Sequence, residues 1–173
     1  MFGPRLKIPE QELWFMNKLI VEFVASFLIW LMFAGLLILW LVDGKIKKEQ
    51  VLHALFAVML AWLVSEMIKV LFPTVRPYLV NGQPPLTLTM PGGSSFPSGH
   101  TSEAFALATT IWLHDRKIGW IYLIWALFVG VARILANVHY PIDIWGGAIL
   151  GIIIAFGFEE AHLFNFVKRF LKK

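Results

Sequence analysis

Five apolar stretches of nearly membrane-spanning length follow one another along this chain of 173 residues. They run over residues 19–42, 51–72, 98–113, 118–138 and 142–166, and the third is the shortest. About 20 residues of α-helix cross the roughly 30 Å of hydrocarbon in a bilayer. A helix also satisfies its own backbone hydrogen bonds there, which an irregular segment cannot do. The pattern therefore predicts an all-α integral membrane bundle with about five transmembrane helices.

The composition agrees with a membrane location. Hydrophobic residues make up 58% of the chain, more than a soluble domain of this length can bury. The absence of Cys excludes disulfides, thiolate nucleophiles and Cys-based zinc sites. The net charge is +4, but the basic residues lie at the ends of apolar segments instead of forming one patch. We therefore expect the bilayer and a membrane lipid as partners, and no nucleic acid.

We interpret residues 1–173 as a single membrane domain. Residues 2–17 mix charges with Leu13, Trp14 and Phe15, which predicts an interfacial N-terminal helix within the segment 1–17. Residues 73–96 are rich in Pro and Gly and cannot lie in lipid with an unsatisfied backbone. This segment is expected to be a surface loop that binds substrate.

The distribution of Lys and Arg predicts the orientation of the five spans. One side of the membrane would carry nine basic residues, at positions 45, 47, 48, 116, 117, 168, 169, 172 and 173. The other side would carry Arg5, Lys7 and Lys18, apart from three basic residues considered below. The positive-inside rule places the first side in the cytoplasm. The loop 73–96 is then expected to face the exterior, or the periplasm in a bacterium with two membranes.

Three clusters of polar residues fall on that outer side. They are Lys69-x₆-Arg76-Pro77, Pro97-Ser98-Gly99-His100 and Arg133-x₅-His139-x₃-Asp143. Ionisable residues at membrane depth are costly and are functional candidates by default.

The residue types suit phosphoryl transfer without a metal. Lys69, Arg76 and Arg133 supply three positive charges for phosphoryl oxygens. Ser98 and Gly99, at a helix start, are expected to leave backbone N–H groups pointing at an anion. No carboxylate cluster has the ligand spacing of Mg²⁺ or Ca²⁺, so we expect no metal and no cofactor.

The two histidines can divide nucleophilic and acid–base work. Asp143 lies four residues after His139 and can fix the tautomer of its imidazole. Pro141 is expected to place Asp143 in the first turn of the fifth helix.

Together the three motifs resemble the signature of the type 2 phosphatidic acid phosphatase superfamily, and they cover residues 69–143. By this resemblance His139 would attack phosphorus and form a phosphohistidine, with Asp143 orienting it. His100 would protonate the leaving oxygen and later activate water. The phosphate-binding residues would be Lys69, Arg76, Ser98, Gly99 and Arg133. The chain departs from the family at Ala132, where the family usually has Ser.

The resemblance implies a lipid phosphatase of the bacterial inner membrane. Undecaprenyl diphosphate is the preferred substrate, and lipid A 1-phosphate, phosphatidylglycerophosphate and phosphatidic acid are alternatives. A soluble haloperoxidase with the same motifs does not fit such an apolar chain. A lipid-phosphate transporter or binding protein could keep the cations, but it would have little need for His100, His139 and Asp143 together.

Some residues near these motifs have simpler interpretations. Glu66 lies three residues before Lys69, so a structural ion pair is an alternative role for that lysine. Glu103 follows His100 by one turn and could tune the site. His53, His114 and His162 are expected to be interfacial residues on the cytoplasmic side.

Overall fold

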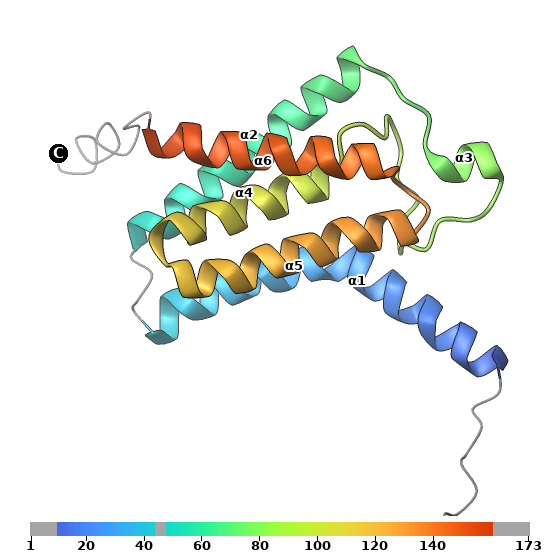
Figure 1. Cartoon of the computed structure of the whole chain (residues 1–173), viewed down its shortest axis with the longest axis horizontal. Helices are drawn as coiled ribbons and strands as arrows, with labels where there is room; N and C mark the ends of the chain where they lie inside the picture. The colour runs from blue at the N-terminus through green and yellow to red at the C-terminus, as the bar shows by residue number, and fades with distance from the viewer. Residues whose placement is uncertain (1–9, 44–47, 161–173) are drawn as a thin grey trace, which may run out of the picture.

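The computed structural model describes residues 10–43 and 48–160, all of them helices or the connections between helices. The elements are α1 (Glu10–Ile38), a π-helical turn η1 (Leu39–Asp43), α2 (Lys48–Leu71), α3 (Pro77–Asn81), α4 (Gly99–His114), α5 (Arg116–Leu135) and α6 (Pro141–Glu160). The five long helices run roughly along one axis, and α3 lies at one end (Figure 1). The predicted helical membrane bundle is confirmed.

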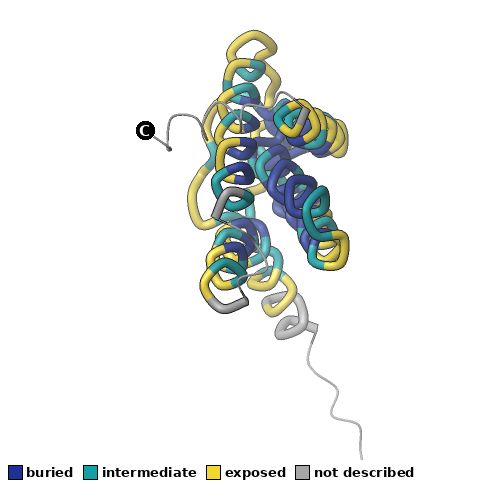
Figure 2. The backbone as a smooth tube through the Cα atoms, turned by 90° about the vertical axis from the view of Figure 1, so that its left-hand side faces the viewer, coloured by how far each residue is buried: buried dark blue, intermediate teal, exposed yellow. Residues whose placement is uncertain are grey.

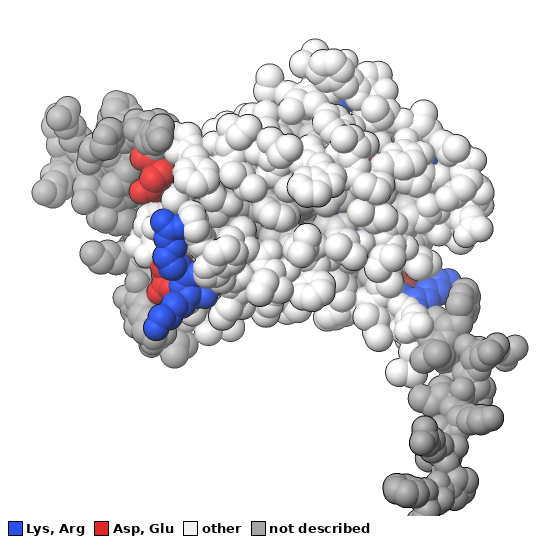
Figure 3. Space-filling model, viewed as in Figure 1, with Lys and Arg blue, Asp and Glu red and all other residues white. Residues whose placement is uncertain are grey.

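Four of the helices are long and apolar enough to cross a membrane. Their candidate spans are Met16–Leu41, Gln50–Leu71, Arg116–Leu135 and Pro141–Glu159. The side chains of these spans that point outward are largely apolar, as at Trp30, Val70 and Trp145. Charged side chains gather near the two ends of the molecule and leave a broad uncharged belt between them (Figure 3). This distribution is that of a multi-pass membrane protein.

The expected third span is the central helix of the bundle. α4 has 16 residues and packs against α2, α5 and α6, and its small residues Ala104, Ala106 and Ala108 are fully buried. At about 1.5 Å per residue it is shorter than the hydrocarbon layer. It can be short because neighbouring helices, and not lipid, surround it. Figure 2 shows buried residues where the helices meet and exposed residues on their outer faces.

Glycines allow α6 to approach α4 closely. A Cβ added at Gly147 would lie 2.7 Å from the Ser98 carbonyl oxygen, and one at Gly151 would lie 2.3 Å from the Ser102 carbonyl oxygen. Small residues four positions apart are a common way for membrane helices to pack backbone against backbone. The contact fixes the start of α4 beside the start of α6, where the polar clusters lie.

The ends of the first and last spans differ from the sequence expectation. The helix expected over residues 2–17 is, from Glu10 onward, the beginning of α1, because no Pro or Gly interrupts the chain between Glu10 and Gly35. Residues 1–9 lie outside the described part. The span expected over 142–166 is helical to Glu160, and residues 161–166 also lie outside it.

Candidate active site

The three polar clusters lie at one end of the bundle. This end is formed by the loop that follows α2, the start of α4 and the connection between α5 and α6 (Figure 1). The loop is held to that connection by hydrogen bonds. Leu86 N–H donates to the Ala136 carbonyl at 2.9 Å, and the side-chain amides of Asn81 and Asn137 bond each other at 2.8 and 3.1 Å. Sequence-distant groups are thereby brought to one depth of the molecule.

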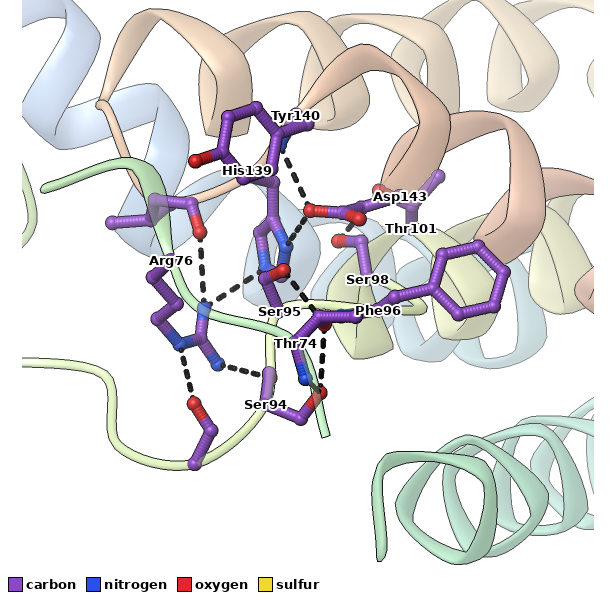
Figure 4. A network of polar contacts seen from close by, with 12 residues as sticks. Thr74, Arg76, Ser94, Ser95, Phe96, Ser98, Thr101, His139, Tyr140 and Asp143 are labelled. Carbon is purple, nitrogen blue, oxygen red and sulfur yellow. Dashed lines mark hydrogen bonds and ion pairs between the residues drawn. The ribbon is translucent and has the colours of Figure 1, made fainter. Parts of the chain in front are cut away.

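His139 and Asp143 form a buried pair. Nδ1 of His139 lies 3.3 Å from Oδ2 of Asp143, and that oxygen also accepts the Tyr140 N–H at 2.8 Å (Figure 4). Pro141 begins α6 and places Asp143 in its first turn, as expected. An ionised carboxylate can only accept, so Nδ1 carries the proton and Nε2 keeps its lone pair. The imidazole is therefore set to act through Nε2.

Burial adjusts the basicity of that imidazole. His139 lies in the connection between two spans and is 3% exposed. Burial, with the nearby positive charges of Arg133 and Arg76, lowers the pKa of His139 to about 4, although Asp143 acts in the opposite direction. The ring is therefore neutral at physiological pH, which is the form that can act as a nucleophile.

Arg76 connects the loop to His139. Its Nη1 donates to the Val138 carbonyl at 3.1 Å and lies 3.3 Å from Nε2 of His139. Its Nε donates to the Gly93 carbonyl, and its Nη2 donates to the carbonyls of Gly92 and Ser94. All five N–H groups of the guanidinium are thus engaged. Four of them donate to backbone carbonyls, and the fifth faces Nε2 of His139.

The base of the loop is closed by hydroxyl groups that no motif indicated. Thr74 Oγ1 accepts the Phe96 N–H at 2.8 Å and contacts the hydroxyls of Ser94 and Ser95 at 2.8 and 3.0 Å (Figure 4). The Ser95 N–H donates to the Thr74 carbonyl at 3.1 Å. The two ends of the loop are therefore tied together directly before α4 begins.

At the start of α4 one sequence expectation is wrong. The Ser98 N–H donates to the Asp143 backbone carbonyl at 3.0 Å, so it does not point at an anion. The close packing of α6 at Gly147 brings that carbonyl within reach. The Ser98 hydroxyl is buried and accepts from Thr101 Oγ1 at 2.9 Å, which leaves its own hydrogen to donate. Gly99 is the first residue of α4, where free N–H groups collect.

Lys69 lies over this helix start. Its Nζ contacts Glu66 Oε1 at 2.6 Å, so the ion pair considered from the sequence exists. The same Nζ lies 3.3 Å from the position that a Gly99 Cβ would take, and Glu103 Oε1 lies 3.8 Å from that position. The lysine is therefore both ion-paired and close to the start of α4. Glu103 approaches the same point, as its spacing suggested.

Arg133 lies in the last turn of α5 and is buried, and one of its N–H donors has no hydrogen-bond partner among the described residues. Nη1 donates to the Ala25 carbonyl of α1 at 3.0 Å, whereas Nε has no hydrogen-bond partner among the described residues. A buried unsatisfied cationic donor is costly unless an anion binds it. Ala132, where the family has Ser, is buried in an apolar cluster with Ala25 and Val138. In this chain the Ala132 side chain contributes to the packing of α5 against α1.

The role of Ala25 could not be found from the sequence. A backbone carbonyl carries no sequence signal, and the contact with Arg133 depends on how α1 packs. Asn137 did offer a signal in its residue type, because Asn tolerates left-handed backbone better than most residues. In the structure its φ is 62°, within that left-handed region. It turns the chain between Arg133 and His139.

Comparison with known proteins agrees with this geometry. A family model described as the PAP2 superfamily matches residues 50–166. The bacitracin transport permease protein BcrC of Bacillus licheniformis is 30% identical over 153 residues, which cover 88% of this chain and 75% of that protein. The undecaprenyl-diphosphatase BcrC of Bacillus subtilis is 32% identical over 123 residues, 71% of this chain and 63% of that protein. The crystal structure of Aquifex aeolicus LpxE aligns with a TM-score of 0.65 and 28% identity, covering 90% of this chain and 88% of that one.

The family match covers more than half of the chain and includes all three polar clusters. It coincides with a helical membrane bundle in which those clusters meet at one end. The chain belongs to the PAP2 superfamily and is a membrane lipid phosphatase.

Proposed function

We propose that this protein removes the terminal phosphate of undecaprenyl diphosphate at the outer face of the bacterial inner membrane, through a phosphohistidine at His139. The observation that carries the chemistry is the position of one imidazole between a carboxylate and a guanidinium. Asp143 holds Nδ1, and Nη1 of Arg76 faces Nε2. The choice of substrate is supported by the name of the B. subtilis relative.

In the first step, Nε2 of His139 uses its lone pair to attack the terminal phosphorus. The bond between that phosphorus and the bridging oxygen breaks. His100, protonated when the negatively charged diphosphate binds beside it, donates that proton to the departing lipid phosphate. The Arg76 hydrogen that faces Nε2 turns to a phosphoryl oxygen. Arg133 Nε, Lys69 Nζ, the Ser98 hydroxyl and the N–H groups at Gly99 offset the remaining charge.

In the second step, His100 removes a proton from water, and the oxygen of that water attacks the phosphohistidine. The P–N bond breaks, its electrons return to Nε2, and inorganic phosphate leaves. We propose that the three cations supply the charge stabilisation that metal ions provide in other phosphoryl-transfer enzymes.

A pocket beside the site offers room for the part of the lipid next to the phosphate. It has a volume of about 450 Å³ and lies between α1, the loop and the end of α5. Lys18, Val21, Leu86 and Leu135 line it, as does Asn137, two residues before His139. We propose that the first units of the lipid chain lie along its apolar side while the rest stays in the bilayer.

Phosphate release by the purified chain in detergent tests this proposal. The substrates are undecaprenyl diphosphate, lipid A, phosphatidylglycerophosphate and phosphatidic acid, each with chelator present, and His139→Asn is the control. We expect undecaprenyl diphosphate to give the highest kcat/KM and the variant to release nothing. A higher rate on another lipid would reassign the substrate. Equal release by the variant would contradict the chemistry.

The orientation has its own test, because the chain has no Cys. Thr89→Cys places a thiol on the exposed loop, and Lys117→Cys places one on the exposed start of α5 at the opposite end. A membrane-impermeant maleimide added to intact cells should label the first variant and not the second. The reverse pattern would contradict an outward-facing site.

A further inference from the structure

A second cluster of ionisable side chains lies at the end of the bundle away from the phosphatase site. It consists of His53 near the start of α2, His114 at the end of α4 and Glu159 near the end of α6. The same three helices carry Lys69, Gly99 and Asp143 at their other ends, and Figure 1 shows these helices running the length of the molecule. The three-residue cluster therefore joins the far ends of the helices that form the active site.

Its ligand atoms are spaced almost as a metal ion needs them. Oε2 of Glu159 lies 3.4 Å from Nδ1 of His53 and 3.8 Å from Nε2 of His114. All three ligand atoms lie within 4.8 Å of one another. Bonds of about 2.0–2.1 Å in a tetrahedral zinc site set neighbouring ligand atoms roughly 3.3 Å apart. Small side-chain movements would be sufficient to close the site.

The His114 imidazole is held by a hydrogen bond in an orientation that suits ligation, and the His53 ring is held by packing. Nδ1 of His114 lies 2.8 Å from the Thr110 carbonyl oxygen, which can only accept, so this nitrogen carries the proton. Nε2 then keeps its lone pair on the side of the cluster, which is the arrangement found around metal-bound histidines. The His53 ring is buried between the rings of His114 and Phe158, at centroid distances of 5.7 and 5.4 Å.

We propose that His53, His114 and Glu159 bind one divalent transition-metal ion, with zinc the best match, and leave a fourth position for water. Two imidazole nitrogens and a carboxylate oxygen form a set of ligands typical of zinc. The Glu159 side chain is 44% exposed, so the ion can enter from the aqueous side. The ion clamps α2, α4 and α6 together. It takes no part in phosphoryl transfer, because it lies at the other end of the bundle.

Cobalt titration of the full chain tests the proposal. The protein is purified in detergent with a tag that contains no histidine, stripped with chelator and titrated with Co²⁺ and then Zn²⁺. We expect one Co²⁺ per chain, with the visible absorption of a four-coordinate ion that zinc abolishes. Zinc in large excess over its Kd should raise the thermal unfolding temperature by roughly 5–10 °C.

Two variants make the outcome specific. Glu159→Gln is nearly isosteric at a half-exposed position, and it should lose the cobalt spectrum and the zinc-dependent stabilisation while retaining phosphatase activity at low temperature. His139→Asn should show the opposite pattern. Equal cobalt binding by wild type and Glu159→Gln would overturn the assignment. So would an unfolding temperature of the wild type that responds to pH but not to zinc, because the cluster would then be only an ion pair.

Discussion

Nη1 of Arg76 lies 3.3 Å from Nε2 of His139, although the two residues are 63 positions apart. The guanidinium occupies a side of the imidazole from which a phosphoryl group can approach, and its other N–H groups hold backbone carbonyls, three of them in the loop at Gly92, Gly93 and Ser94. In the proposed mechanism, substrate displaces one hydrogen bond of Arg76 without disturbing the rest. The loop and His139 are linked through a single side chain.

Asp143→Asn should abolish most of the activity while leaving the fold in place. Oδ2 of Asp143 accepts both the Tyr140 N–H and the Nδ1–H of His139, so an amide oxygen in that position can keep both hydrogen bonds. The variant loses the negative charge that would stabilise the positively charged ring formed when Nε2 is phosphorylated. We expect kcat to fall on the order of 10² to 10³-fold. A kcat within tenfold of wild type, with KM and unfolding temperature unchanged, would show that the charge of Asp143 does not matter.

The acid limb of the pH–rate profile should lie at an unusually low pH. In the proposed mechanism the neutral imidazole of His139 attacks, and its pKa is lowered to about 4, so we expect activity to be lost as pH falls through that value. In the unfolded chain the same group has its ordinary pKa of 6.5 and binds a proton first, so folded stability also decreases as pH falls from 6.5 toward 4. The measurement is kcat/KM against pH. An acid limb at the ordinary histidine value would contradict the assignment.

Gly99→Ala should weaken phosphate binding. The added methyl group would lie 3.3 Å from Lys69 Nζ and 3.6 Å from Ser65 Oγ, so the end of the lysine must shift by a few tenths of an ångström. We expect KM to rise by up to about tenfold, the value for complete loss of one contact worth about 1.4 kcal/mol, with a smaller change in kcat. Gly92→Ala is the matched control, because a Cβ there meets nothing within 4 Å. Equal KM values in the two variants would argue against a role for Lys69 in binding.

Gly151→Ala should destabilise the bundle without touching the site. Its Cβ would lie 2.3 Å from the Ser102 carbonyl oxygen and 2.8 Å from Ala106 N, both backbone atoms of α4 that cannot turn aside. Overpacking of this kind costs about 1–3 kcal/mol. Gly157→Ala, on the same helix with open space around its Cβ, should unfold at the wild-type temperature or slightly above it. Thermal unfolding in detergent compares the two, and equal unfolding temperatures would contradict the close packing of α4 and α6.

The sequence predicted the features that depend on local patterning. The lengths of the apolar stretches indicated the spans, and Pro141 indicated where α6 begins. The three motifs pointed to residues that the structure brings to one end, including the pair His139 and Asp143. These predictions succeeded because hydrophobic length, helix-start chemistry and charge at membrane depth are properties of short segments.

Features that depend on packing could not be predicted. The Ser98 N–H is bound to the Asp143 carbonyl because glycines let α6 approach α4, and no motif reports that distance. Arg76 was expected to bind phosphate, and no motif indicated that its guanidinium donates to three loop carbonyls. His53 and His114 appeared to be isolated interfacial residues, because their helices are joined with Glu159 only in three dimensions.

The most direct test of the proposed mechanism is to trap the phosphoenzyme. Purified protein is mixed with undecaprenyl diphosphate labelled in its terminal phosphate, quenched in alkali within the first turnover and digested for mass spectrometry. We predict an alkali-stable, acid-labile phosphoryl group on His139 of the wild type, which is absent from His139→Asn. Label on another residue, or turnover by the wild type with no labelled protein at any time within the first turnover, would contradict a phosphohistidine at His139.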